Sequence, residues 1–254
     1  MKKHRGTMPI ILTCPHGGTG TPLGVQEREK TKTESSCRNF TRSRDVETDI
    51  VTEGVAQKIL QLTGLSPYVV IAEFSRKFID ANRELKCAFN VDDSNAKAFY
   101  EEYHNSISDS VSQILQDNNN RGFLFDIHGI REIPEDPADI YLGTANGKTL
   151  PNLQRMDIFK AHGLHGLLKA SRHQIGSEGT DSVFQYRVSP TDVDSRETNQ
   201  VRGGFTVRRY ADLMINCIQI ELADTLRQNE EKRNLIIEDL AFAMINFVRR
   251  HSLF

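Results

Sequence analysis

Three ionisable side chains lie at or near the ends of predicted strands, in positions where they can act together. His16 comes after one apolar run, His128 ends a second, and Glu221 closes a third. In an open α/β sheet, ligands bind beyond the carboxyl ends of the strands. Two imidazoles and a carboxylate form a typical catalytic zinc site, with water in the fourth position. A carboxylate that does not bind the metal can then serve as general base.

More carboxylates for such a site open the first predicted long helix, at Asp45, Glu47 and Asp49. A single histidine at a strand end is more often an ordinary hydrogen-bonded residue than a metal ligand. Here two histidines each come after an apolar run and each precede a glycine, which suggests a metal centre and leaves both interpretations open. Asp126, two residues before His128, is either a partner that orients this ligand or an ordinary strand-end acid. The spacing leaves the third ligand open.

Short apolar runs alternate with amphipathic stretches along the chain. The runs predict strands at residues 9–14, 68–74, 122–128, 140–143, 183–188 and 214–221. Apolar residues at helical spacing predict helices over residues 46–62, 99–115 and 236–248. This alternation favours an α/β fold, a mostly parallel mixed sheet with helices on both faces. A core of about 250–300 residues is the upper limit for one domain, so we expect residues 1–254 to form a single domain.

Two long stretches carry no hydrophobic period, residues 19–44 and residues 176–204. Long irregular segments inside a compact domain are usually functional or mobile. We therefore expect either segment to border the active site.

The bulk composition argues against several classes of protein. Charged residues make up 26% of the chain and the formal net charge is −2, which gives no reason to expect a nucleic acid or membrane partner. No apolar run approaches the ~18–20 residues that span a bilayer. The short apolar run after the basic start is interrupted too soon for a signal peptide. Four cysteines without a CxxC pair argue against a disulfide scaffold and favour a cytoplasmic location.

Three other motifs are set aside. The His-Gly-Gly at residues 16–18 is similar to an esterase oxyanion loop, but the chain has no Gly-x-Ser-x-Gly nucleophile elbow. Residues 143–149 fall one residue short of a phosphate-binding P-loop. His162 and His165 are spaced to bind a metal from one helix, but adjacent glycines weaken that helix, so a packing or solvated role is favoured.

Six short blocks occur in order over most of the chain: PHGG (15–18), FIDANR (78–83), FDIH (125–128), DIYLG (139–143), RGGFTVRRY (202–210) and QIE (219–221). Together they resemble the N-formylglutamate amidohydrolase family, which is similar to zinc carboxypeptidases and aspartoacylases. The resemblance implies a phosphorylase/hydrolase-like, three-layer α/β/α fold and a zinc-dependent amidohydrolase activity.

The resemblance also implies a ligand set for one zinc ion (Zn²⁺) per chain. His16 and His128 match the two histidine ligands. The third ligand is expected from residues 47–49, which resemble the family's Asp-Thr-Asp stretch; Asp49 is the first choice and Glu47 the second. The chain departs from the carboxypeptidase pattern, in which an acid lies three residues after the first histidine, because Thr19 stands there.

Substrate-binding roles follow from the same resemblance. Asn82 and Arg83 match the pair that holds the substrate's carboxylate, a task suited to the planar guanidinium of arginine. Arg208 and Arg209 are expected to add a second anion contact or to polarise the scissile carbonyl, and are otherwise surface arginines. Arg76 is a further candidate on the same reasoning.

The leading hypothesis is hydrolysis of the N-formyl or N-acyl amide of a small carboxylate-bearing substrate, such as N-formylglutamate. Glu221 matches the carboxylate that takes a proton from water and passes it to the leaving amine, and Arg83 assists by orienting the substrate. Otherwise Glu221 is a strand-end acid paired with an arginine. A second hypothesis keeps the metal but admits peptides or cell-wall fragments into an open groove. A third is a non-catalytic binding protein on the same fold.

Overall fold

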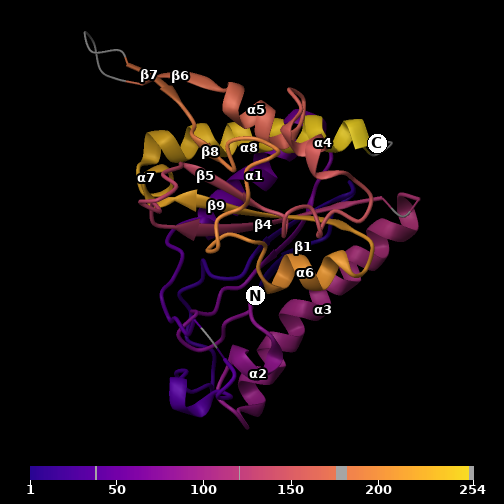
Figure 1. Cartoon of the computed structure of the whole chain (residues 1–254). Helices are drawn as coiled ribbons and strands as arrows, with labels where there is room; N and C mark the ends of the chain where they lie inside the picture. Colours follow the sequence, from indigo (N-terminus) through magenta and orange to yellow (C-terminus); the bar gives the residue numbers. More distant parts are fainter. Residues whose placement is uncertain (38, 120, 176–181, 252–254) are drawn as a thin grey trace.

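The chain folds around a seven-stranded mixed sheet in residues 1–37, 39–119, 121–175 and 182–251, which the computed structural model describes (Figure 1). From one edge to the other, its strands are β1 (Lys2–His4), β3 (Tyr68–Ile71), β2 (Ile10–Cys14), β4 (Phe123–Ile130), β9 (Asn216–Ala223), β5 (Ile140–Gly143) and β8 (Val188–Ser189). The four central strands β3, β2, β4 and β9 run parallel, while β1 and β5 pair antiparallel with their inner neighbours. The predicted fold class is confirmed.

Helices cover both faces of this sheet. On one face lie α1 (Thr48–Thr63), α4 (Arg155–Phe159), α5 (Leu164–Ala170), α7 (Asp224–Arg227) and α8 (Glu230–His251). On the other face lie α2 (Leu85–Ala88), α3 (Ser94–Asp117) and α6 (Phe205–Ala211). Figure 1 shows α8 running along one side of the sheet and α3 and α6 along the other. Each face is sealed by its own cluster of buried apolar side chains.

The ends of the long helices have local causes. The side chain of Asp93 accepts a hydrogen bond from the backbone of Ala96 at 2.8 Å and so caps the start of α3. Gly64, with φ 71°, adopts the left-handed conformation that commonly ends a helix, and it closes α1. Because Asp93 precedes the first apolar residue of the helical pattern, α3 begins earlier than the predicted residue 99.

Strand alternation places the polar residues of the central strands on one face. Leu124 packs in the apolar cluster beneath α3 and α6. Because side chains alternate along a strand, Asp126 and His128 of β4 lie on the same face as Leu124. The parallel register then sets Gln219 beside Asp126 and Glu221 beside His128. The sheet therefore gathers these four polar side chains towards the carboxyl ends of β4 and β9.

The two irregular segments differ from each other. The described residues of the range 19–44 contain only the short 3₁₀ helix η1 (Lys30–Lys32) and one bridge, from Gly20 to Phe74. Of the second segment, residues 176–181 lie outside the described residues. The predicted strand at 183–188 is divided between β7 (Ser182–Gln185), which pairs with β6 (Arg172–Ile175) in a separate projecting hairpin, and β8 in the main sheet (Figure 1).

The expectation against a disulfide scaffold did not foresee that one pair of cysteines is joined. Cys37 and Cys87 are joined, although 50 residues separate them in the sequence. The first irregular segment meets the region of α2, where the backbone N–H of Val91 donates to the carbonyl of Lys32 at 2.8 Å. This tertiary contact, which brings the two thiols together, is not revealed by cysteine spacing. Cys14 and Cys217 are free and buried. Because disulfides persist mainly in oxidising compartments, the cysteine pattern no longer favours the cytoplasm, and that location stays a prediction.

No helix within the described parts of the chain has the length and apolar character needed to cross a membrane.

Candidate active site

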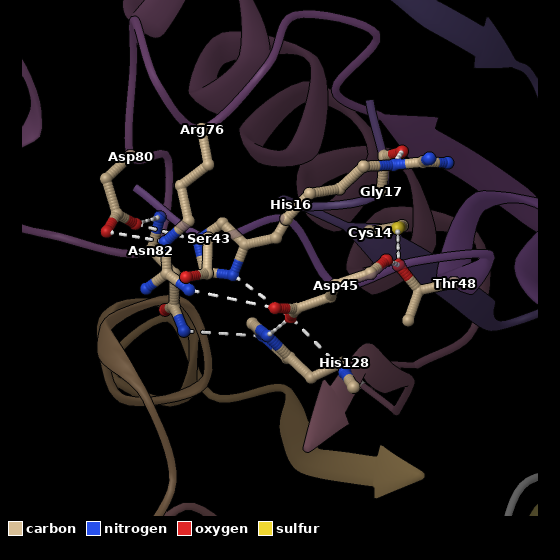
Figure 2. A network of polar contacts seen from close by, with 12 residues as sticks. Cys14, His16, Gly17, Ser43, Asp45, Thr48, Arg76, Asp80, Asn82 and His128 are labelled. Carbon is tan, nitrogen blue, oxygen red and sulfur yellow. Dashed lines mark hydrogen bonds and ion pairs between the residues drawn. The ribbon is translucent and has the colours of Figure 1, made fainter. Parts of the chain in front are cut away.

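Three buried side chains converge at the carboxyl ends of β2 and β4, as Figure 2 shows. The Nδ1 atoms of His16 and His128 lie 3.3 and 3.2 Å from the same carboxylate oxygen, Oδ2 of Asp45. All three potential ligand atoms lie within 4.8 Å of one another. Ligands at ~2.0–2.1 Å on adjacent corners of a zinc tetrahedron are about 3.3 Å apart, so the spacing suits such an ion.

The other ring nitrogen of each histidine faces a second buried carboxylate. Nε2 of His16 lies 2.7 Å from Oδ1 of Asp80, and Nε2 of His128 lies 2.8 Å from Oδ2 of Asp126. When each Nε2–H donates to its carboxylate, the lone pair of each Nδ1 points towards Asp45. Lone pairs so close to a carboxylate oxygen repel it unless a positive charge lies between them. The donor set therefore fits a divalent metal ion. Asp80 and Asp126 orient the two imidazole rings through the nitrogen atoms that face away from the ion.

Asp45 reaches this position through the turn that precedes α1. Its backbone N–H donates to the carbonyl of His16 at 3.1 Å, and its own carbonyl accepts from the hydroxyl of Thr48 at 2.8 Å. Its Oδ2 also accepts from the backbone N–H of Gly129 at 3.2 Å. Glu47, with φ 64°, takes the left-handed conformation that turns the chain into the helix.

The structure brings neither of the two predicted third ligands to the histidines. Asp49 lies in the first turn of α1, and its carboxylate pairs with Arg44 at 3.2 Å. The carboxylate of Glu47 pairs with Arg233 of α8. Asp45 occupies the place that we had expected for Asp49, because the left-handed turn at residue 47 separates the three acids in space. Asp45 is therefore the candidate for the third ligand.

The charges around the three residues favour a cation between them. Burial disfavours ionisation of Asp45, but His16, followed by the hydrogen bond from His128, holds the pKa of Asp45 below its usual value. Burial also disfavours the charged form of His128, but the adjacent Asp126 raises the pKa of His128 well above its usual value. The protein thus stabilises positive charge at this point, whether it is carried by a proton or a metal.

Arg76 neutralises part of the surplus negative charge. Its Nε donates to Oδ2 of Asp80 at 3.0 Å, and its Nη1 lies 3.7 Å from Oδ1 of Asp45. Burial opposes ionisation of Asp80, but Arg76 and then His16 keep the pKa of Asp80 well below its usual range. The guanidinium of Arg76 is therefore engaged with two site carboxylates while also lining the cavity described next.

Glu221 lies beside His128 as its register partner on the neighbouring strand. One oxygen, Oε1, accepts a hydrogen bond from Nε2 of Gln219 at 2.8 Å. Burial, together with the nearby charge of Asp45, raises the pKa of Glu221 to about 7, although His128 opposes the shift. A carboxyl group with such a pKa can both take up and release a proton near neutral pH.

A cavity of about 1460 Å³ opens over these residues. Its walls include His16, Asp45, His128 and Glu221. The other predicted site residues on its walls are Arg76, Asn82, Arg83 and Arg208. Described residues of both irregular segments also line it, as expected, between residues 36 and 44 and between residues 199 and 204.

Asn82 and Arg83 lie where the first irregular segment meets α6. The Oδ1 atom of Asn82 accepts from the backbone N–H and the hydroxyl of Thr206, at 2.8 and 3.1 Å, and its Nδ2 lies 3.3 Å from Nε2 of His128. The guanidinium of Arg83 donates to the carbonyl of Asn82 at 3.1 Å and to that of Asn39 at 3.4 Å. About a third of the Arg83 side chain is exposed, 31%, which leaves it accessible from the cavity.

The two consecutive arginines of α6 point in different directions. Arg208 lines the cavity, and its Nη2 donates to the carbonyl of Arg202 at 3.0 Å. Arg209 instead lies over the rings of Phe205 and Tyr210, with its guanidinium carbon 5.7 and 5.8 Å from the ring centres. Successive helical residues are about 100° apart, so only one of the pair can face the site.

Sequence reasoning missed the roles of Asp80 and Gln219 and did not choose Asp45. Asp80 and Gln219 both lie in blocks that carried the family resemblance. Their place in those blocks is the sequence signal that could have marked them as partners of the site residues. Asp45 was named only as one of three acids before the helix, and nothing in their spacing distinguishes it. The contact of Asp126 with His128 is the one that its i, i+2 position suggested.

Comparisons with known proteins bear on this site. Residues 8–89 match the model of a protein family, FGase, the N-formylglutamate amidohydrolases. The resemblance to N-formylglutamate amidohydrolases is confirmed. The matched segment includes His16, Asp45, Asn82 and Arg83, whereas His128 and Glu221 lie beyond it.

Solved structures extend the likeness over the whole fold. An N-formylglutamate amidohydrolase from Ralstonia eutropha JMP134 superposes with a TM-score of 0.62 at 18% identity, over 96% of this chain and 94% of the other. A gene product from Agrobacterium tumefaciens gives a TM-score of 0.57 at 13% identity, over 96% and 92%. At these identities the likeness shows a shared fold. Among curated proteins, none matches the sequence.

Proposed function

We propose that the protein is a zinc-dependent amidohydrolase that cleaves the N-formyl or N-acyl amide of a small carboxylate-bearing substrate, such as N-formylglutamate. The observation that carries this proposal is the convergence of His16, Asp45 and His128 on one point beside the carboxylate of Glu221. The match of residues 8–89 to the N-formylglutamate amidohydrolase model supports the substrate class.

In this proposal one metal ion per chain is held by Nδ1 of His16, Nδ1 of His128 and a carboxylate oxygen of Asp45. When bound, the ion supplies Lewis-acid polarisation of the scissile carbonyl and lowers the pKa of water. Asp80 and Asp126 keep the two rings in the ligating tautomer by accepting from their Nε2–H groups. Two imidazoles and one carboxylate also accept other first-row metals, so zinc is the expected rather than the exclusive ion.

Glu221 moves the protons of the reaction. Its carboxylate accepts a proton from the attacking water as the C–O bond forms at the amide carbon. It then donates that proton to the leaving nitrogen as the C–N bond breaks, which gives a free amine and a carboxylic acid, such as formic acid, that then releases its own proton to become the carboxylate. A pKa of about 7 suits both steps, and the hydrogen bond from Gln219 fixes the orientation of the carboxylate.

Arg83 and Asn82 orient the substrate. The side-chain amide of Asn82 lies against His128 and Thr206, which places it at the edge of the metal centre. Arg83 is partly exposed in the cavity and its guanidinium is directed by backbone carbonyls, so its remaining donors are available for a carboxylate of the substrate. Arg208 offers a second positive charge on the cavity wall.

One observation favours a second candidate, cleavage of a larger substrate such as a peptide or cell-wall fragment. The cavity, at about 1460 Å³, is larger than the ~300–1,000 Å³ of typical small-molecule sites. A formylated amino acid would fill only part of this space. The metal centre and Glu221 would keep the same roles, and only the bound portion of the substrate would differ.

The test combines metal analysis with a substrate panel. We expect the purified protein to bind about one zinc ion per chain, and His128→Ala to lose it. We expect the wild type to hydrolyse N-formyl and N-acetyl amino acids in preference to N-acylated tripeptides. Preference for the longer substrates would favour the second candidate. Absence of zinc after incubation with the metal, or zinc without turnover on any substrate, would favour a non-catalytic binding protein.

A further inference from the structure

The segment that falls one residue short of a P-loop binds an anion of the protein itself. After β5, residues 144–147 form a tight turn in which Ala145, Asn146 and Gly147 all have positive φ angles, 52°, 55° and 91°. Successive backbone N–H groups in such a turn form a concave anion site. The carboxylate of Glu197 occupies it, accepting from the backbone N–H of Thr144 at 2.8 Å and of Asn146 at 3.0 Å, and from the Thr144 hydroxyl.

This contact anchors the second irregular segment to the sheet. Glu197 is buried, with 3% of its surface exposed, and its backbone N–H donates to Oδ1 of Asn146 at 3.2 Å. A second anchor lies just upstream, where the guanidinium of Arg155 donates to the carbonyls of Val193 and Ser195. A buried carboxylate that accepts three hydrogen bonds holds its segment far more firmly than an exposed ion pair does.

The anchored segment carries Arg202 to the active-site wall. Gly203 has φ 70° and packs so closely on the end of β5 that a Cβ at Gly143 would lie 2.7 Å from its nitrogen. A Cβ at Gly204 would lie 2.3 Å from the side-chain amide of Asn82. The backbone that follows Arg202 is thus wedged between the sheet and a candidate substrate-binding residue, and Glu197 holds the backbone that precedes it.

Arg202 stands at the junction of two cavities. It lines the main cavity and also a smaller one of about 320 Å³, which it shares with Arg208. The smaller cavity is further lined by Lys148, and by Asp212 as its single acid. Within the described residues, neither Arg202 nor Lys148 forms an ion pair. Three cations around a cavity with one acid favour an anionic occupant.

We propose that Arg202, with Lys148 and Arg208, binds a carboxylate of the substrate that is distal to the scissile amide, and that Glu197 is the positioning residue for Arg202. This proposal rests on the proposed amidohydrolase function and adds a specificity subsite to it. The anionic end of the substrate enters the smaller cavity while its acyl end remains at His16 and His128. Glu197 does not touch the substrate in this arrangement and acts only through the segment that carries Arg202.

The first test compares an acidic substrate with its neutral isostere. N-formylglutamate and N-formylglutamine differ only in the distal carboxylate. We expect Arg202→Ala and Lys148→Ala to raise KM for the acid by about tenfold, the loss of one or two charge-assisted hydrogen bonds, and to change kcat less than twofold. KM for the amide should not move. Arg196→Ala is the matched control, because Arg196 is an exposed arginine of the same segment that lines neither cavity.

A double-mutant cycle tests the positioning role. Glu197→Gln loses one of the two acceptor oxygens in the turn, and we expect it to raise KM for N-formylglutamate severalfold in the wild-type background. In the Arg202→Ala background the same change should have no further effect on KM. Additive effects in the cycle would overturn the positioning role, because a general structural defect acts whether or not Arg202 is present. If Glu197→Gln does not fold, Thr144→Val, which removes only the hydroxyl donor, replaces it in the cycle.

Binding of glutarate, measured by calorimetry, separates this proposal from the proposed function. Glutarate carries two carboxylates and no amide, so it requires no turnover. Glutarate binding that weakens in Lys148→Ala but not in Arg196→Ala supports the subsite. This holds even if the protein hydrolyses neither formyl substrate, because the lack of hydrolysis would count only against the proposed function. The subsite would be overturned by two results together. Arg202→Ala would lose turnover of N-formylglutamate and of N-formylglutamine equally, and Lys148→Ala would bind glutarate as well as the wild type does.

Discussion

Glu221 lies directly beside His128 because the two residues are register partners on the parallel strands β4 and β9. The pairing places the Glu221 carboxylate, which is not a proposed ligand, at the edge of the proposed metal site and on the same face of the sheet as His128. The neighbour on its own strand, Gln219, holds one of its oxygens at 2.8 Å. Sheet register, rather than any loop, therefore fixes the distance between the proposed proton carrier and a proposed ligand.

Glu221→Gln separates proton transfer from metal binding. The amide has nearly the same shape but cannot accept a proton, so we expect kcat to fall by about 10²–10⁴-fold. Zinc content should remain near the wild-type value, because Glu221 is not a proposed ligand. Metal analysis and steady-state kinetics on the same preparation check both expectations. Loss of zinc together with activity would make Glu221 a ligand and remove it from the proton-transfer role.

Asp45 and Asp49 provide a matched pair for the third ligand. Asp45→Asn removes the carboxylate that faces both histidines, and we expect zinc affinity to fall by at least tenfold. Asp49→Asn removes only a partly exposed ion pair with Arg44, so zinc affinity should be unchanged. Competition with a coloured chelator measures both. The opposite result would restore Asp49 as the ligand.

Much of the fold was predictable because its signals are local. Apolar runs gave the central strands, and helical spacing gave α1, α3 and α8, since both periodicities come from burying one face of an element. His16 and His128 were predictable as a pair for a related reason. Parallel neighbouring strands such as β2 and β4 end at the same edge of the sheet, so residues just after their ends meet in space.

The parts that could not be predicted depend on tertiary contacts. The choice of Asp45 over Asp49 is decided by a left-handed residue, Glu47, and by the backbone N–H of Gly129, which is remote in the sequence. The pairing of Cys37 with Cys87 depends on the path of a segment that has no hydrophobic period. Such segments pack on the surfaces that the helices and strands leave uncovered. Their course therefore cannot be read from a hydrophobic period in the sequence.

Asp126 should control zinc affinity without touching the metal. Its Oδ2 lies 2.8 Å from Nε2 of His128, and its Oδ1 accepts from the hydroxyl of Thr13 at 2.6 Å. Asp126→Asn can no longer stabilise the ligating tautomer as a charged acceptor, so we expect zinc affinity to fall about 10–100-fold. Thr13→Val leaves the carboxylate in place and should weaken affinity less. Equal affinities for all three proteins, measured by chelator competition, would show that Asp126 does not orient the ligand.

His104 should make the protein sensitive to mild acid. The imidazole is buried between α3 and α6, where Nε2 donates to the carbonyl of Ala81 at 3.0 Å and Nδ1 lies 2.9 Å from the hydroxyl of Tyr210. Burial, with the charge of Arg209 acting in the same direction, lowers the pKa of His104 to about 3. The unfolded chain, with a histidine pKa near 6.5, therefore binds a proton that the folded protein does not bind between about pH 6.5 and pH 3.

The sign of this effect follows from the two pKa values. The contribution of neutral His104 to stability is complete above pH 6.5 and decreases as the pH falls, by up to about 1.4 kcal/mol for each pH unit. His104→Gln has no imidazole to protonate, so its free energy of unfolding should fall less between pH 7 and pH 5 than that of the wild type. We expect the variant to be less stable than the wild type at pH 7. Urea unfolding of both proteins at the two pH values measures the difference. Equal slopes would mean that His104 is protonated in the folded protein or remains accessible to water.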